Sequence, residues 1–471
     1  MKDESTIAHV IAERYYLRSG VIFIFCLSCY FSVWKLVGFI PFGVGDGVGF
    51  DGSIYLDYII RLSRGESVQG DPYRLIRIVG FTPAVFYVAI FSVEDTSSIV
   101  RFQAIFNAVT LSAIVTILSD LLIRLTEKPR MALLIVGSMF FSWAWLVMPV
   151  YYPLLSDHAA LAISTASLWA WAVGRRILLG SIIFISTWIM PGLFIVPLVL
   201  LCLPFRRYQV EFQWRWSLWL ALVILAIFFL WPIVNLTYQQ ILNHPIGMPR
   251  GWPEMKWMSL IFLCVEMLCV IIFWVRIIGE RNLIYFSDWK SILVGMLTLF
   301  GSAIFIWAFF NWREGFVGPP LMEYLYLQSV SAPGKPAIAH FIYYGPLFLI
   351  AFIAGMCSET FLKDSRSYPI FVLISICFPI LFIGSESRQW LYFLPPMAVF
   401  VALNGVSLKV AALGVVFAVF SHVVYLFARE SNFYFSRQGP WMSIEDYLFG
   451  LLLLLSFFVI YLLINKSEKI K

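Results

Sequence analysis

The sequence predicts an all-α polytopic integral membrane protein with about 12 to 14 transmembrane helices. Hydrophobic residues make up 61% of the 471 residues and charged residues only 13%, whereas soluble domains carry roughly a quarter charged residues. Apolar runs of about 17 to 25 residues, the length that a helix needs to cross a bilayer, recur along the chain. Runs such as Tyr447 to Ile464 carry no charge and do not alternate apolar with polar residues, so helices are favoured over a barrel.

The apolar runs give the expected elements in chain order. We expect membrane helices at 19–40, 78–93, 98–123, 131–149, 159–174, 217–236, 257–275, 291–310, 341–357, 369–384, 389–403, 409–428 and 447–465. The run 178–203 is interrupted by Pro191 and Gly192, which predicts two short helices that meet at one face of the membrane. Because the longest hydrophilic stretches are 41–77 and 311–340, residues 1–471 are expected to form a single membrane domain.

The distribution of basic residues predicts the orientation. From residue 124 onward, short loops rich in Lys and Arg alternate with longer mixed loops, and basic loops face the cytoplasm. Both termini are therefore expected in the cytoplasm, with 41–77 and 311–340 as the two long extracytoplasmic loops. The runs 78–93 and 98–123 supply one crossing too many for this arrangement, so one of them is expected to be re-entrant or interfacial.

The first outer loop places carboxylates on glycine-rich turns. Asp46 and Asp51 lie among five glycines that let the backbone turn tightly, at positions 43, 45, 47, 49 and 52. Apolar residues at helical spacing follow, Tyr55 among them, and predict a helix on the membrane surface. An acid held there could serve as a general base, or as a ligand for a divalent cation such as Mg²⁺ or Mn²⁺. A solvated connector with Asp–Gly turns is the alternative for either acid alone.

Charged and aromatic residues stand before the next apolar run. Asp71 and Tyr73 are followed by Arg74 and Arg77. The two arginines are three residues apart at the start of a helix, so both can point one way and bind a phosphate. Interfacial snorkelling of single arginines explains their position equally well. Their closeness in sequence to Asp51 favours the functional interpretation.

Two more polar clusters fall on the same predicted face. Asp157 and His158 stand before a helix and could form a second acidic or metal site. Helix capping by Ser156 or Asp157 is the simpler alternative. Glu386 and Arg388 lie in a short polar stretch, which is also typical of a hairpin with an interfacial Trp.

One carboxylate lies within an expected membrane helix. Glu266 interrupts an otherwise uncharged run, and intramembrane carboxylates are functional candidates by default. A protonated carboxyl group hydrogen-bonded between helices is the alternative for a lone acid.

The strings GFDGSIYLDYI (49–59) and DPYRLIRIVGFTPAVF (71–86) carry a resemblance to a known class. They resemble the first-loop signature of bacterial multi-pass glycosyltransferases of the GT-C class, G-[FY]-D-G-x-x-Y followed by D-x-x-x-Y-R-x-x-R-x-x-x-P. The spacing from Asp71 to Tyr73 is shorter here, and the proline arrives at Pro83. The match is concentrated in the first outer loop.

This resemblance implies a GT-C-like fold with interfacial helices in the first extracytoplasmic loop. It also implies a glycosyl-transfer reaction. Members of the class take a sugar from a polyprenyl-phosphate carrier, and an acid of that loop acts as catalytic base. Carried over, Asp51 is the expected base, and Arg74 and Arg77 would contact the donor phosphate. Arg388 would join them from the late outer loop, and Asp157 resembles the acid of the second loop. Supporting positions are Tyr55, Asp71, Tyr73 and Glu386.

The leading hypothesis is a glycosyltransferase of the bacterial inner (plasma) membrane in cell-envelope glycan or glycolipid synthesis. It would transfer a sugar, with inversion, to a hydroxyl of a glycan, lipid or protein on the extracytoplasmic face. Its expected partners are the donor, the acceptor and membrane lipids, without nucleic acid. The sequence has no Walker loop, dinucleotide fingerprint or zinc motif. Alternatives are a polysaccharide polymerase, a lipid-linked oligosaccharide flippase, and a secondary transporter that uses Glu266 as a proton site.

Overall fold

The structure is a computed structural model. It describes residues 4–37, 48–68, 72–190, 192–203, 212–213, 255–280, 283–284, 289–309, 321–357, 367–427 and 442–469. Helices dominate these residues, and one antiparallel pair of two-residue strands joins β1 (Phe212–Gln213) to β2 (Leu283–Ile284). The helical class is therefore confirmed for the described part of the chain. The helix expected at 217–236 lies outside it.

The first part of the chain is a series of helices joined by short turns. They are α1 (Glu4–Val37), α2 (Phe50–Ser63), α3 (Pro72–Leu75), α4 (Ile78–Phe91), α5 (Thr96–Thr126), α6 (Pro129–Phe140), α7 (Trp143–Leu146), α8 (Met148–Tyr151), α9 (Asp157–Val173), α10 (Arg176–Ser186) and α11 (Ile195–Cys202). Local sequence sets several of the ends. The carboxylate of Asp95 accepts a hydrogen bond from the Ser98 amide and caps α5. Pro129 begins α6, where its missing N–H is not needed.

The second part continues in the same way. Its elements are α14 (Lys256–Glu280), α15 (Trp289–Phe309), α16 (Leu321–Val330), α17 (Lys335–Tyr344), α18 (Leu347–Cys357), α19 (Ser367–Ile383), the 3₁₀ helix η2 (Ser387–Phe393), α20 (Leu394–Leu403), α21 (Leu408–Phe427) and α23 (Ile444–Lys469). Pro395 and Pro396 stand in the first turn of α20, which suits their fixed φ.

Several of these helices are long and apolar enough to cross a membrane. Among the described residues, three pass this test: Leu17–Lys35 of α1, all of α5, and Ile444–Ser467 of α23. The number rises to five if each of two bent helix pairs forms one span. Large apolar side chains on the outside of α1 and α23 are exposed, for example Ile24 and Leu462, as a lipid-facing surface requires. The total of 12 to 14 crossings stays a prediction.

Some predicted elements differ from those of the structure. The run 131–149 is divided into α6 and the α7–α8 pair, with a bend of 70°. The helix expected at 341–357 begins earlier and bends by 118° between α17 and α18, where Gly345 has a φ of 69°. The described part of the expected loop 311–340 is largely helical, forming α16 and the start of α17. Lys335 and His340 are buried there, so helix packing keeps this stretch out of solvent.

Other predicted elements match. The interrupted run 178–203 forms two helices, α10 and α11. α2 is the helix expected after the glycine-rich turns, and it packs on α4. α4 has 14 residues and α5 has 31, whereas a crossing needs about 20. The lengths favour α4 as the run that does not cross.

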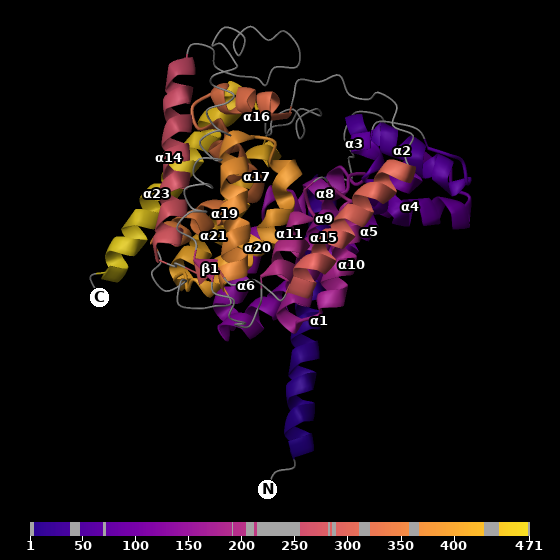
Figure 1. The fold of residues 1–471 in the computed structure, drawn as a ribbon, viewed down its shortest axis with the longest axis horizontal. Coiled ribbons are helices and arrows are strands. Elements are labelled where there is room, and N and C mark those ends of the chain that lie inside the picture. The colour runs from indigo at the N-terminus through magenta and orange to yellow at the C-terminus, as the bar shows by residue number, and fades with distance from the viewer. Residues whose placement is uncertain are drawn as a thin grey trace.

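The packing brings distant segments to one end of the bundle. α5 packs against α1, α4, α6, α8 and α9, and α20 packs against α5, α6, α9, α18 and α19. α20 thereby joins the first and second parts of the chain. In Figure 1, α2, α3 and α4 gather at the end of the bundle opposite to the N-terminus of α1.

Candidate functional site

Asp51 lies in the first turn of α2, and a tyrosine from another segment holds that turn. The hydroxyl of Tyr152 accepts hydrogen bonds from the amides of Asp51 at 2.9 Å and Gly52 at 3.4 Å. Gly49 stands before the helix with φ 73° and ψ −177°, a conformation that is essentially limited to glycine. A Cβ at Gly49 would lie 2.1 Å from Cε2 of Tyr152. Gly49 therefore permits both the turn and the close approach of the ring.

The Asp51 carboxylate forms an ion pair with Arg74 of α3. Nη2 of Arg74 donates to Oδ1 of Asp51 at 2.9 Å, and Nε donates to the same oxygen at 3.3 Å. The two side chains are 29% and 24% exposed, so this pair remains accessible. Both partners were predicted as site residues, and the structure places them in direct contact.

Arg77 contacts Gln389 of a distant segment, although it stands only three residues after Arg74. Its side chain is fully buried, and Nη2 donates to Oε1 of Gln389 at 2.9 Å. Nε2 of Gln389 donates to Oε1 of Glu386 at 3.1 Å. The start of α4 is thus tied to the segment that carries Arg388, which is more than 300 positions away in the sequence.

Asp157 and Arg388 form the buried side of the site. Nε of Arg388 lies 3.5 Å from Oδ1 of Asp157, and the Arg388 guanidinium lies over the Tyr152 ring, 5.7 Å from its centre. Asp157 is 1% exposed, and its carboxylate accepts no hydrogen bond from the described residues. At this end of α9, burial raises the pKa of Asp157, while Arg388 and Arg77 act in the opposite direction.

The simpler alternative for Asp157 and His158, in which Ser156 or Asp157 caps the N-terminus of α9, is wrong. Ser156 occupies the N-cap of α9 without a side-chain capping hydrogen bond. Nε2 of the neighbouring His158 lies 3.5 Å from Nε2 of Gln103. Its ring meets Phe106 edge-on. Within the part of the chain that the structure describes, no three His, Cys, Asp or Glu side chains are grouped to hold a metal ion.

Two residues outside the predicted site residues, Gln328 and His340, position the Arg388 segment. Oε1 of Gln328 accepts hydrogen bonds from the amides of Ser385 at 2.7 Å and Glu386 at 3.2 Å. Nε2 of His340 lies 2.8 Å from a backbone carbonyl and therefore carries the proton, so Nδ1 accepts from the Ser387 hydroxyl at 2.7 Å. Gln328 and His340 both lie in the stretch expected to be a loop, which is why no helical pattern pointed to them.

Tyr55 of α2 is another predicted site residue. It is fully buried, and burial raises the pKa of its hydroxyl, while the charges of Arg77 and Arg388 act in the opposite direction. Among the described residues, the site therefore combines the accessible carboxylate of Asp51 with the guanidinium groups of Arg74, Arg77 and Arg388, which come from two distant segments. A carboxylate can accept a proton, and guanidinium groups bind phosphate oxygens. Asp46, Asp71 and the side chain of Tyr73 lie outside the described residues.

The chain was compared with known protein families, curated proteins and solved structures. No protein-family model, no curated protein and no solved structure matches the chain.

Proposed function

We propose that this protein is a membrane-embedded glycosyltransferase of the GT-C type, which transfers a sugar from a polyprenyl-phosphate carrier to an acceptor hydroxyl. The observation that supports it most is the ion pair between Asp51 and Arg74, the two residues to which the first-loop resemblance gives the roles of base and phosphate ligand. Arg388, whose guanidinium lies over the Tyr152 ring, and Arg77, which donates to Gln389, add the positive charge that a donor phosphate needs.

The proposed reaction is a single displacement. The donor phosphate binds to the accessible guanidinium of Arg74, which turns from Asp51 to the phosphate, while the buried Arg77 and Arg388 add positive charge nearby. The freed carboxylate of Asp51 removes a proton from the acceptor hydroxyl. That oxygen attacks the anomeric carbon while the bond from this carbon to the phosphate oxygen breaks, so polyprenyl phosphate leaves and the configuration inverts.

Accessibility favours Asp51 over Asp157 as the base. The side chain of Asp51 is 29% exposed, whereas that of Asp157 is 1% exposed and faces Arg388. An acceptor as large as a glycan or glycolipid hydroxyl can reach only the first. We assign Asp157 the role of holding Arg388 in place.

The test is sugar transfer by purified protein in nanodiscs, with a panel of radiolabelled polyprenyl-phosphate sugars. We expect transfer from at least one donor, an inverted anomeric centre in the product, and weaker donor binding in Arg74→Gln. Arg61→Gln is the matched control, since Arg61 is paired with Asp57 on the exposed side of α2. Transfer from no donor would favour the polymerase or flippase alternatives, and a retained configuration would refute the single displacement.

A further inference from the structure

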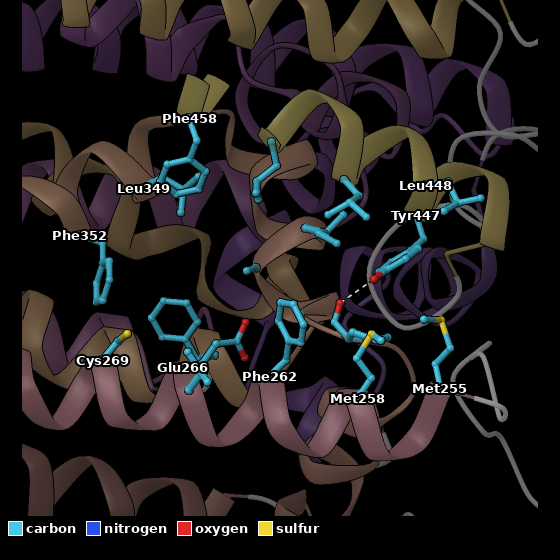
Figure 2. A pocket seen from close by; sticks show the side chains of 18 residues that line it. Met255, Met258, Phe262, Glu266, Cys269, Leu349, Phe352, Tyr447, Leu448 and Phe458 are labelled. Carbon is cyan, nitrogen blue, oxygen red and sulfur yellow. Dashed lines mark hydrogen bonds between the residues drawn. The ribbon is translucent and has the colours of Figure 1, made fainter. Parts of the chain in front are cut away.

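A second candidate site lies away from the outer loops, in a cavity of about 450 Å³. Its walls come from α14, the turn before α17, α17 to α19, and α23, and it shares no residue with the candidate site described above. The lining is apolar except for the carboxyl group of Glu266 and the hydroxyl of Tyr447. Figure 2 shows Glu266 reaching from α14 into the space below Leu448 and Tyr447 of α23.

The two polar groups of the cavity are not equivalent. The Tyr447 hydroxyl donates to the carbonyl of Pro333 at 2.7 Å and is thereby satisfied. The carboxyl group of Glu266 forms no hydrogen bond or ion pair with any described residue. A carboxyl group in apolar surroundings is costly unless a donor reaches it. Within the described part of the chain, the carboxyl group of Glu266 is therefore an acceptor without a donor, and the side chains around it are mainly apolar.

The cavity also opens toward the surface of the bundle. α14 packs on α16, α18 and α19, whereas α23 packs on α17 and α21. The space lies between these two groups of helices. Phe262, Val265 and Leu448 line it and are also about half exposed. The rest of this surface of α14 carries large apolar side chains such as Ile261, so the opening faces the region where lipid chains are expected.

We propose that this cavity binds a neutral lipid alcohol, with the chain against the apolar walls and the hydroxyl donating to the carboxyl group of Glu266. The volume falls in the range of small-molecule sites. No Lys or Arg is found among the described residues that line the cavity, so beside these residues a phosphate or carboxylate head would lack a counter-charge and would meet Glu266. A pure hydrocarbon would leave the Glu266 carboxyl group without a donor. This site does not depend on the proposed transferase activity.

The experiment uses the full-length protein in detergent and a hexadecanol that carries a photoreactive diazirine on its chain. We expect labelling of α14 and α23, with hexadecanol competing at least about fivefold better than hexadecane, the value of one hydrogen bond. Hexadecyl phosphate should compete more weakly still. Equal competition by all three compounds would overturn the proposal.

Four variants locate the site and its acceptor. Glu266→Gln keeps an acceptor and should keep the preference for the alcohol, whereas Glu266→Leu should abolish that preference while hydrocarbon binding remains. Ala337→Phe fills the cavity and should remove labelling. Cys264→Phe adds the same ring on the exposed side of α14 and should not. Thermal unfolding confirms that each variant is folded. Undiminished labelling of folded Ala337→Phe, or an unchanged preference in Glu266→Leu, would refute the site.

Discussion

Tyr152 contacts the turn that carries Asp51 through its hydroxyl and Arg388 through its ring. Replacing Tyr152 by Phe removes the acceptor for the amides of Asp51 and Gly52 but keeps the ring beneath Arg388. The 2.9 Å hydrogen bond to Asp51 contributes about 1 kcal/mol, and the 3.4 Å hydrogen bond to Gly52 contributes less. We expect Tyr152→Phe to lower the free energy of unfolding by about 1 to 2 kcal/mol.

Tyr152→Phe should also lower the rate of sugar transfer. If the loosened turn misplaces Asp51 in the transition state, the same 1 to 2 kcal/mol corresponds to a rate about five- to thirtyfold lower. Thermal unfolding and single-turnover transfer in nanodiscs measure the two effects. Tyr343→Phe is the control, because the buried Tyr343 hydroxyl has no hydrogen-bond partner among the described residues. Equal stability and equal rates for the two variants would refute the role of the Tyr152 hydroxyl.

Three further results are expected. Arg388→Met should lower the free energy of unfolding by about 3 kcal/mol, because it leaves the buried Asp157 without its cation. In thermal unfolding, the double variant Arg388→Met/Asp157→Asn should recover most of this lost stability. Additive losses in the double variant would contradict the pairing. Because burial raises the pKa of folded Asp157 above its unfolded value, the stability this group provides at low pH is lost as pH rises through the folded pKa. The free energy of unfolding of the wild type, measured relative to that of Asp157→Asn, should therefore fall as pH rises in unfolding scans. Gly49→Ala should be at least about 2 kcal/mol less stable than Gly65→Ala, since both residues have a φ of 73° but only Gly49 faces Tyr152; equal stabilities would show that the ring moves aside.

The sequence was sufficient for features that depend on local pattern. Apolar runs predicted most helices, and the glycine-rich turn followed by a periodic apolar face predicted α2. The pairing of Asp51 with Arg74 could be anticipated from the sequence, because the two residues are only 23 positions apart. Local pattern also marked Pro191 and Gly192 as the break between two short helices.

Contacts between distant segments were not predictable in this way. Nothing near Gln389 in the sequence indicates that it accepts a hydrogen bond from Arg77, because this contact depends on how α20 joins the two parts of the bundle. Gln328 and His340 were assigned to a loop, since a polar residue that binds a buried backbone cannot be distinguished from a solvated one by pattern alone. The isolation of Glu266 in a cavity likewise follows from helix packing and not from its apolar neighbours in the sequence.

The most direct test of the account is the transfer rate of Asp51→Asn beside that of Asp57→Asn. Both changes replace a carboxylate by an amide on α2, but Asp57 is exposed and paired with Arg61. We predict that Asp51→Asn binds the donor and unfolds like the wild type, yet transfers sugar at least about 100-fold more slowly. Asp57→Asn should transfer at the wild-type rate. Wild-type transfer by Asp51→Asn would contradict the assignment of Asp51 as the base, and an equal loss in both variants would point to a general effect of charge on α2.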